Sequence, residues 1–260
     1  MENYMNKIIE NLEKNIVSDN VLFDIYGVSD QEHFDCMFIA PRWTPDKVFD
    51  INTVDIKQIS SNMDADTFQI NHNGKKYLFI KLEIGAPNIA DFCLSCYMAN
   101  CDKFVFLGSA GALVPGIKIG DVIIPEYAIS GNGATLYLHD RLNSQHLFEH
   151  VYSTQKLNEQ IINICNEQNI NVLNAPVISI DSLIAEYAHL DEFRAMGAQL
   201  IEMEVATFFA CMNTINKNAS AILVIADNSA SGEHLIGRPE EDKKHYHNIR
   251  GQIGNVLLKL

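Results

Sequence analysis

Polar residues that could carry chemistry follow several apolar segments of this chain, each at the point where the apolar segment ends. These residues are Pro41-Arg42, Glu83-Ile84-Gly85, Gly108-Ser109-Ala110-Gly111, Asp181-Ser182 and Asp227-Asn228-Ser229. Short apolar segments predict buried strands, and folds built on such strands bind ligands outside the carboxyl ends of the strands. We therefore expect these residues to gather at one site. A further polar group, Glu202-Met203-Glu204, comes directly before a predicted helix.

Asp227 is the carboxylate that is hardest to explain as a structural residue. It follows the aliphatic segment 221–226, where a charged group is costly to bury unless it has a partner or a raised pKa. A carboxylic acid that stays protonated near neutral pH can protonate a leaving group. Asp227 is therefore a candidate general acid.

The other two motifs each allow a structural and a functional interpretation. Glu202 and Glu204 precede an apolar helix, so they could bind a ligand or simply interact with the positive end of the helix dipole. The small residues 108–111 could let backbone N–H groups approach an oxyanion, or they could form an ordinary tight turn. This segment is not a Walker phosphate loop, because no Gly-Lys-Ser or Gly-Lys-Thr follows it.

The six cysteines raise the question of metal or redox chemistry. Cys93 and Cys96 form a Cys-x-x-Cys motif, but no histidine or second motif of this kind supports a metal site. The motif lies in an apolar segment that predicts a buried helix. We therefore predict free thiols in the core and no metal.

The elements that would position these residues alternate along the chain. The predicted strands are 36–40, 104–107, 121–125, 177–180 and 221–226, and the predicted helices are 1–20, 87–99, 157–168, 206–216 and 240–260. Asn73-Gly74 separates two further apolar segments, 67–70 and 77–82, and predicts a β-hairpin. Apolar strands that alternate with helices predict one α/β domain whose sheet is covered on both faces.

Composition narrows the classes of partner. The chain has 260 residues, of which 47% are hydrophobic, and a formal net charge of −14. Such a charge repels phosphate backbones and anionic membranes, so we expect neither nucleic acid nor a membrane as a partner. No apolar run is long enough to cross a bilayer, and the first residues are too polar for a signal peptide. We therefore expect a cytoplasmic protein that acts on a small molecule.

Several segments taken together resemble the nucleoside phosphorylase family, which includes uridine phosphorylase, hexameric-type purine nucleoside phosphorylase, methylthioadenosine nucleosidase and AMP nucleosidase. The segments that carry the resemblance are 104–113, 119–125, 131–138, 196–207 and 225–234. The resemblance begins at about Phe23, which implies an N-terminal helical extension over 1–22 and a catalytic domain over 23–260. It also implies a three-layer α/β/α fold with a central mixed sheet flanked by helices.

The resemblance implies a set of residues around the sugar of a nucleoside. Glu204 would hold the ribose 2′- and 3′-hydroxyl groups, a task suited to a carboxylate acceptor. Met203 would pack under the sugar, Ile84 would line it, and Glu202 would belong to the same substrate site. Asp24 would reach the 5′ side of a neighbouring subunit's site. The active protein is thus expected to be a homo-oligomer, a dimer or a trimer of dimers.

The resemblance also implies residues around the base and the nucleophile. Asp227 would protonate or hydrogen-bond purine N7 as the glycosidic bond breaks, because the strand-end aspartate is similar to that of the purine branches. Leu183 and Ile184 would contact the base. Ser109 and the backbone of Gly108 would face the attacking nucleophile.

The sequence departs from the family at the expected phosphate site. Phosphorylases hold phosphate among several arginines, but two of these positions are Phe106 and, approximately, Met63 here. Arg42 and Lys47 are the cations that the sequence places nearby, and with Ser109 they would place the phosphate if the reaction is phosphorolysis. Glu83 could repel phosphate, act as a general base for water, pair with Arg42 or face solvent.

Three functions are consistent with these residues. The first is phosphorolysis, in which a purine nucleoside and phosphate give the free base and ribose 1-phosphate, with inorganic phosphate as the co-substrate and no other cofactor. The second is hydrolysis by a nucleosidase that uses water because the arginines are missing. The third is a nucleoside-binding relative that has lost catalysis.

Overall fold

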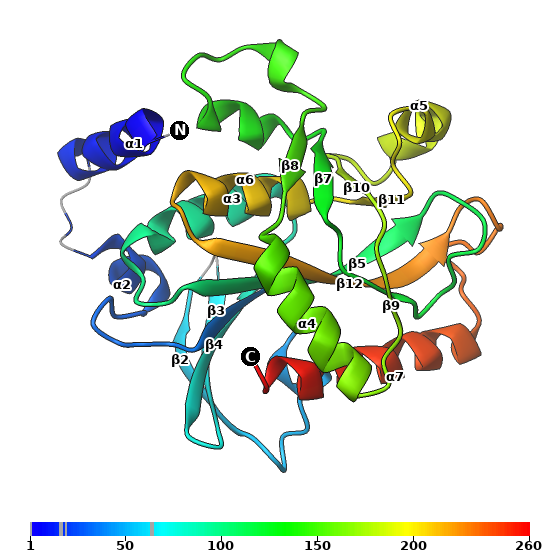
Figure 1. Ribbon diagram of the computed structural model, residues 1–260, viewed down its shortest axis with the longest axis horizontal. Helices are drawn as coiled ribbons and strands as arrows, with labels where there is room; N and C mark the ends of the chain where they lie inside the picture. The colour runs from blue at the N-terminus through cyan, green and yellow to red at the C-terminus, as the bar shows by residue number, and fades with distance from the viewer. Residues whose placement is uncertain (1, 16–17, 19, 63–64) are drawn as a thin grey trace.

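The computed structural model describes residues 2–15, 18, 20–62 and 65–260 (Figure 1). Its α-helices are α1 (Glu2–Asn15), α2 (Val21–Tyr26), α3 (Ala86–Ser95), α4 (Gln155–Glu167), α5 (Leu190–Ala195), α6 (Val205–Thr214) and α7 (Glu240–Leu257). Its strands are β1 (Cys36–Pro41), β2 (Asp55–Ser61), β3 (Ala65–His72), β4 (Lys75–Leu82), β5 (Lys103–Ala112), β6 (Val122–Ile123), β7 (Tyr127–Ser130), β8 (His150–Tyr152), β9 (Val172–Leu173), β10 (Val177–Ser179), β11 (Leu200–Glu202) and β12 (Asn218–Asn228).

The strands form one mixed sheet around β5. The main path runs β2-β3-β4-β1-β5-β11-β10-β7-β8, and β12 pairs with β5 along its length. Strands β1, β4, β5 and β12 are mutually parallel where they pair, whereas β11 is antiparallel to β5. The carboxyl ends of β1, β4, β5 and β12 therefore point to the same edge of the sheet.

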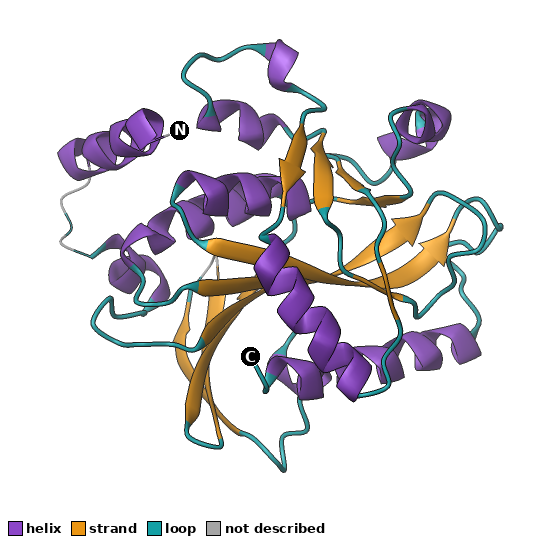
Figure 2. Ribbon diagram, viewed as in Figure 1, coloured by secondary structure: helices purple, strands orange, loops and turns teal. Residues whose placement is uncertain are grey.

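Helices cover both faces of this sheet (Figures 1 and 2). Helices α3 and α6 pack together on one face, with Phe92 and Phe208 fully buried between them and the strands. Helices α4 and α7 cover the other face, where Ile161 and Ile253 are buried against the strands. The predicted three-layer α/β/α fold with a mixed central sheet is thus confirmed.

Local sequence signals account for several of these elements. Asn73 and Gly74 both have positive φ, 48° and 79°, as a two-residue hairpin turn between β3 and β4 requires. Cys93 and Cys96 are buried free thiols on and beside α3, and the other four cysteines are also free and buried. The predicted hairpin and the predicted free thiols in the core are confirmed, whereas the absence of a metal stays a prediction.

The structure corrects one expectation about the glycine-rich segment. Strand β5 does not end at Leu107 but continues to Ala112, so residues 108–111 lie inside a strand and form no tight turn. They are paired with β12, from Gly108 opposite Leu223 to Gly111 opposite Asp227. Tertiary pairing thus overrides the low strand propensity of glycine.

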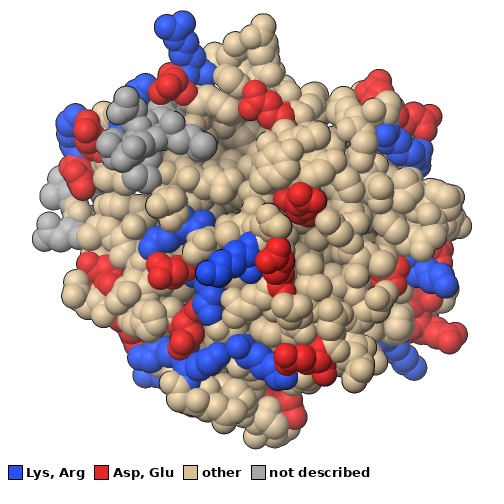
Figure 3. Space-filling model, viewed as in Figure 1, with Lys and Arg blue, Asp and Glu red and all other residues tan. Residues whose placement is uncertain are grey.

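The lengths of the helices and the surface charge are relevant to the prediction that the protein has no membrane or nucleic-acid partner. None of the helices within the described residues is long and apolar enough to cross a bilayer. Figure 3 shows one face of the molecule, on which acidic and basic side chains are mixed. The absence of a nucleic-acid or membrane partner stays a prediction.

Candidate active site

A cavity of about 220 Å³ lies at the carboxyl ends of the strands. Its lining residues are Pro41, Arg42, Trp43, Ile84, Phe106, Gly108, Ser109, Ala110, Gly111, Leu183, Glu186, Ile201, Glu202, Met203, Glu204, Ala226, Asp227 and Leu235. Most of the residues to which the sequence assigns a role at the site therefore come together here. Among the residues with an assigned role, the exceptions are Asp24, Lys47, Glu83 and Ile184. The strand-end residues Gly85, Asp181, Ser182, Asn228 and Ser229, which the sequence also predicted at the site, do not line the cavity either.

Glu204 is held at the junction of β11 and α6. Its side chain is buried, and Oε1 accepts a hydrogen bond of 2.8 Å from the backbone N–H of Gly85, in the loop after β4. Gly85 has φ of 122°, a conformation that favours glycine. Burial and the nearby Glu202 carboxylate raise the pKa of Glu204 above its usual value. The result is a fixed carboxyl group on the wall of the cavity.

Glu202 interacts with the start of α6, which is the structural role that the sequence allowed for Glu202 and for Glu204. Its Oε2 accepts hydrogen bonds from the backbone N–H groups of Glu204 (2.6 Å) and Val205 (2.9 Å), at the start of α6. Its Oε1 accepts a hydrogen bond from the hydroxyl of Ser179. Glu202 therefore caps α6 and positions Glu204, and a direct contact with substrate stays a prediction.

A bulge in β12 aims Asp227 at the cavity. The pairing with β5 shifts between Ile225 and Asp227, so Ala226 is the extra residue. Asp227 then lies opposite Gly111, where a Cβ atom would come within 3.0 Å of its Oδ2. Burial raises the pKa of Asp227 to about 6, although the positive charges of Arg238 and His234 oppose this shift. The carboxyl group is thus partly protonated near neutral pH, as a general acid requires.

Glu186 is a second acid in the cavity, and the sequence motifs did not single it out. It lies in a 3-10 turn, Ala185–Ala188, and is only 8% exposed. Burial and the charge of Asp227 raise its pKa to about 7. Because the two carboxylates repel each other, the state in which both are ionised is disfavoured. One signal was present: Glu186 follows Leu183 and Ile184, the predicted base contacts.

Of the two residues predicted to contact the base, Leu183 and Ile184, only one lines the cavity. Leu183 lines the cavity, whereas Ile184 does not and is 74% exposed. Asp181, in the loop after β10, accepts hydrogen bonds from Asn132 Nδ2 and Gly133 N, both at 2.8 Å. It therefore fixes the loop after β7 rather than facing the cavity.

Ser109, in β5, also lines the cavity. Its Oγ lies 2.6 Å from the hydroxyl of Tyr246, which α7 supplies. Phe106 lines the cavity beside it, and its ring occupies the space beside Gly108, where a Cβ atom would come within 2.6 Å of Cε1. An aromatic ring thus stands where the family resemblance implies an arginine, while Met63 lies outside the described residues.

Arg42 and Glu83 pair with each other at the rim. The distance between Arg42 Nε and Glu83 Oε2 is 3.8 Å, and both side chains are largely exposed. Such a pair contributes little stability. Arg42 has φ of 58°, a left-handed conformation that favours glycine and is often found at ligand sites. Lys47 is exposed at the end of a 3-10 turn, Pro45–Lys47, outside the cavity lining.

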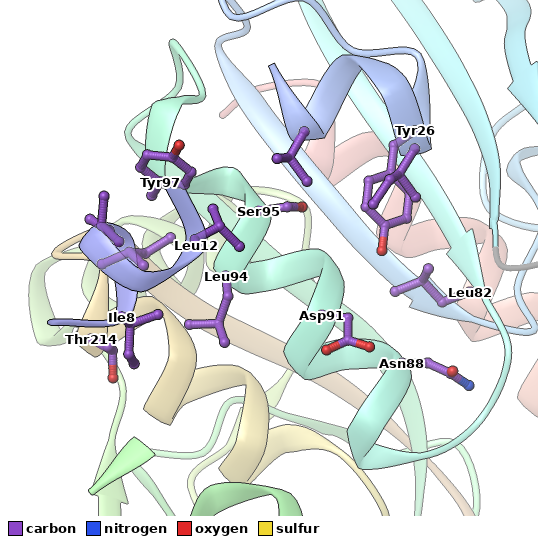
Figure 4. A pocket seen from close by; sticks show the side chains of 14 residues that line it. Ile8, Leu12, Tyr26, Leu82, Asn88, Asp91, Leu94, Ser95, Tyr97 and Thr214 are labelled. Carbon is purple, nitrogen blue, oxygen red and sulfur yellow. The ribbon is translucent and has the colours of Figure 1, made fainter. Parts of the chain in front are cut away.

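A larger cavity, of about 370 Å³, lies between α1, α2, α3 and the end of α6 (Figure 4). Its wall is mostly apolar and includes Ile8, Leu12, Leu94 and Tyr97. Among the described residues, Asp91 is the one acidic group that lines it, whereas four acids with raised pKa values, Glu186, Glu202, Glu204 and Asp227, line the smaller cavity. We therefore place the candidate active site in the smaller one.

One group of side chains elsewhere has metal-binding chemistry. His139, His146 and Glu149 offer ligand atoms that lie within 4.8 Å of one another. The two imidazole rings are parallel, 3.7 Å apart between centroids, which is a stacking geometry rather than a convergence on one ion. This group does not line the candidate active site.

The fold and the site together define the class of protein. The chain belongs to the phosphorylase superfamily, whose family model matches residues 46–260.

Individual relatives are distant in sequence. A DeoD-type purine nucleoside phosphorylase from Brevibacillus brevis is 23% identical over 171 residues, covering 64% of this chain and 69% of the relative. A guanosine phosphorylase from Halorubrum lacusprofundi is 22% identical over 179 residues, covering 68% of this chain and 72% of the relative.

Solved structures of enzymes with different specificities share the fold. Uridine phosphorylase from Vibrio fischeri has a TM-score of 0.73 at 18% identity, covering 89% of this chain and 93% of its own. The 5′-methylthioadenosine/S-adenosyl homocysteine nucleosidase of Campylobacter jejuni has a TM-score of 0.68 at 16% identity, covering 87% and 97%.

Proposed function

We propose that this protein cleaves the N-glycosidic bond of purine nucleosides by phosphorolysis. The observation that carries the proposal is the meeting of Glu204, at the start of α6, and Asp227, in β12, in the wall of one cavity that Ser109 also lines. Glu204 accepts hydrogen bonds from the ribose hydroxyl groups, and Met203 packs under the sugar. Asp227 donates a proton to N7 of the departing base. Phosphate attacks the anomeric carbon from the side of Ser109.

The electrostatics of the cavity suit a transition state in which positive charge develops on the ribose. Burial raises the pKa of Glu204, and the positive charge that develops on the ribose in turn favours its ionised form. That carboxylate stabilises the charge more strongly than an exposed one, because little water screens it. Proton transfer from Asp227 removes the negative charge that would otherwise build up on the base. The two relatives named for purine nucleoside and guanosine phosphorolysis support the same assignment.

A single assay tests this function. Adenosine, inosine, guanosine and uridine are each incubated with the protein, with and without inorganic phosphate, and free base and ribose 1-phosphate are measured. We expect base release from the purine nucleosides that depends on phosphate and yields ribose 1-phosphate. The same release without phosphate would instead indicate hydrolysis, and no release would indicate a binding protein.

Hydrolysis is the second candidate function, and Phe106 is the observation that favours it. Its ring gives the cavity an apolar surface at the position where the family resemblance implies a cation. Under hydrolysis, Glu83 would have to leave its pair with Arg42 and turn inward to act as the base for water. In that case Glu83→Gln abolishes activity, and phosphate has no effect.

We further propose that Glu186 binds the purine base and favours guanine over adenine. Guanine offers two donors on one edge, N1–H and the 2-amino group, whereas adenine offers its 6-amino group beside an acceptor nitrogen. A carboxylate accepts both donors of guanine at once. Such binding favours the ionised form of Glu186. Because the state in which both acids are ionised is disfavoured, Asp227 then stays protonated and can protonate N7.

We therefore predict that Glu186→Gln lowers kcat/KM for guanosine by about 10- to 100-fold and affects adenosine less. The amide retains one acceptor oxygen but presents an N–H group to a donor, so one buried hydrogen bond is lost and left unsatisfied. Steady-state kinetics with both nucleosides measure the change. Glu126→Gln, at an exposed glutamate outside the cavity, is the control. Equal losses on guanosine and adenosine contradict this role for Glu186.

We also propose that the active form is a homo-oligomer in which Asp24 completes a neighbouring site. Asp24 lies on α2 between Phe23 and Ile25, two apolar side chains that are 54% and 38% exposed. Large exposed apolar groups of this kind are common at interfaces between subunits. Sedimentation is expected to show at least a dimer, and a fully active monomer overturns the proposal.

A further inference from the structure

Arg250 on α7 is a buried cation without a matching anion among the described residues. It is only 9% exposed, and its Nε atom is buried without a hydrogen-bond partner. Arg238, in the loop before α7, has the same unpaired Nε atom, although its Nη1 donates a hydrogen bond to the carbonyl of Ala226. Within the described part of the chain, neither arginine takes part in a salt bridge. Buried guanidinium groups normally have such partners.

Aromatic rings hold these two guanidinium groups close to the candidate active site. The ring of Tyr246 has Arg238 at 5.3 Å and Arg250 at 5.6 Å, and Arg250 also lies 5.4 Å from the ring of Trp43. The hydroxyl of Tyr246 in turn contacts Ser109. These aromatic contacts stabilise the cations in part, but they leave the Nε–H donors unsatisfied.

The cation cluster, Arg238 and Arg250 with the ring of Tyr246 between them, does not itself line the cavity but contacts three residues that do. Trp43, Ser109 and Ala226 all line the cavity. Trp43 contacts Arg250, Ser109 contacts Tyr246, and Ala226 accepts the hydrogen bond from Arg238. The cluster therefore lies directly behind the wall that Ser109 forms.

The local charge is positive around this wall. Burial together with the charges of Arg250, Arg238 and Lys47 lowers the pKa of His247, one turn before Arg250 on the exposed side of α7. Glu240 acts on His247 in the opposite sense but is itself paired with Lys243 at 2.7 Å. Arg238 also acts on Asp227 in the cavity, because its positive charge opposes the rise in the pKa of Asp227 that burial causes.

We infer that Arg238 and Arg250, together with Ser109, bind a phosphate group, and that α7 thereby supplies the positive charge that Phe106 does not. The inference rests on the proposed function, because there the phosphate is the attacking co-substrate. Guanidinium groups suit the task, since their planar N–H donors match the oxygens of a phosphate dianion. A phosphate carried by a nucleotide substrate has the same chemistry and is a separate source of the same group.

Thermal unfolding in the presence of inorganic phosphate tests the site without any need for turnover. A ligand that binds only the folded state raises Tm. We expect phosphate to raise the Tm of the native protein by several degrees, and to have no such effect on Arg250→Met or Arg238→Met. The control is Arg141→Met, at an exposed arginine outside the cavity, which should respond like the native protein.

The same variants distinguish anion binding from a purely structural cation–π role. Without phosphate, Arg250→Met should keep the native Tm or raise it, because an uncompensated buried charge has been replaced by an apolar chain of similar length. A structural role predicts a lower Tm with the phosphate response intact, and this result overturns the inference. So does a native protein whose Tm responds neither to inorganic phosphate nor to a nucleoside 5′-monophosphate.

Kinetics separate the two sources of phosphate. If it is the co-substrate, Arg250→Met raises the phosphate KM at least ~10-fold with guanosine as the substrate, and Arg250→Lys raises it less. If the source is a nucleotide, inorganic phosphate gives little Tm response, and Arg250→Met weakens cleavage of the 5′-monophosphate at least ~10-fold relative to the nucleoside. The protein could bind phosphate through both arginines and yet cleave no nucleoside. That result refutes the proposed function but supports the phosphate site.

Discussion

Replacing Glu204 by alanine is expected to lower kcat/KM for guanosine by about 10²–10⁴-fold. The variant loses two hydrogen bonds between a carboxylate and the ribose hydroxyl groups, each worth about 1.5–3 kcal/mol. Each factor of ten in rate corresponds to about 1.4 kcal/mol. The charge also stabilises the developing cation of the sugar, so the loss should appear in kcat as well as in KM. Steady-state kinetics measure both parameters.

Two controls separate the possible causes of this loss. Glu204→Gln keeps an acceptor for the backbone N–H of Gly85, 2.8 Å away in the native protein, and isolates the effect of the charge. Glu202→Gln removes the carboxylate that caps α6, so it should lower Tm and affect the rate indirectly. Near-native turnover by a folded Glu204→Ala protein contradicts the assignment of Glu204 to the ribose.

The part of the site that the sequence predicts consists of residues at strand ends. Arg42, Ser109 and Asp227 follow or lie within strongly apolar segments, and parallel strands bring such points to one edge of the sheet. Only the positions of the strands were needed for this prediction, and continuous apolar runs reveal those positions well. Glu204 was predicted on other grounds, its place directly before an apolar helix and the family resemblance, because the short strand β11 before it was not predicted.

The part that the sequence did not predict lies on helices and turns. Tyr246 and Arg250 are four residues apart and thus on the same face of α7, together with the buried Ile253. An arginine on an amphipathic helix normally faces solvent, so periodicity alone gives no reason to place it inside. The role of Glu186 depends on a 3-10 turn that places it in the same cavity as Asp227, a residue that is distant in sequence.

Short and glycine-rich strands were also difficult to predict. Strand β11 has only three residues, and β5 continues through Gly108 and Gly111 because β12 pairs with it throughout. Strand propensity depends on such pairing, and no local pattern encodes it. The bulge at Ala226, which aims Asp227, belongs to the same class of features.

Asp227→Asn is expected to lower kcat/KM for guanosine by about 10²–10⁴-fold, the range typical of general acid catalysis. Asparagine can donate a weak hydrogen bond to N7 but cannot transfer a proton. The pH dependence gives a second measurement. Because the pKa of Asp227 is raised to about 6, its active protonated form decreases as the pH rises through that value. Glu186 and Glu204 titrate in the same range in both proteins. The ratio of the native kcat/KM to that of the asparagine variant should therefore fall between about pH 6 and pH 8.

A substrate that needs no proton provides the decisive control for Asp227. In 7-methylguanosine the N7 position already carries a methyl group and a positive charge, so the base leaves without protonation. Asp227→Asn should therefore cleave 7-methylguanosine at a rate much closer to that of the native protein than it cleaves guanosine. Equal losses on the two substrates would mean that Asp227 organises the cavity rather than donating a proton. Efficient cleavage of uridine, which has no N7, by the native protein would likewise contradict the role, because the acid would then have no acceptor on the base.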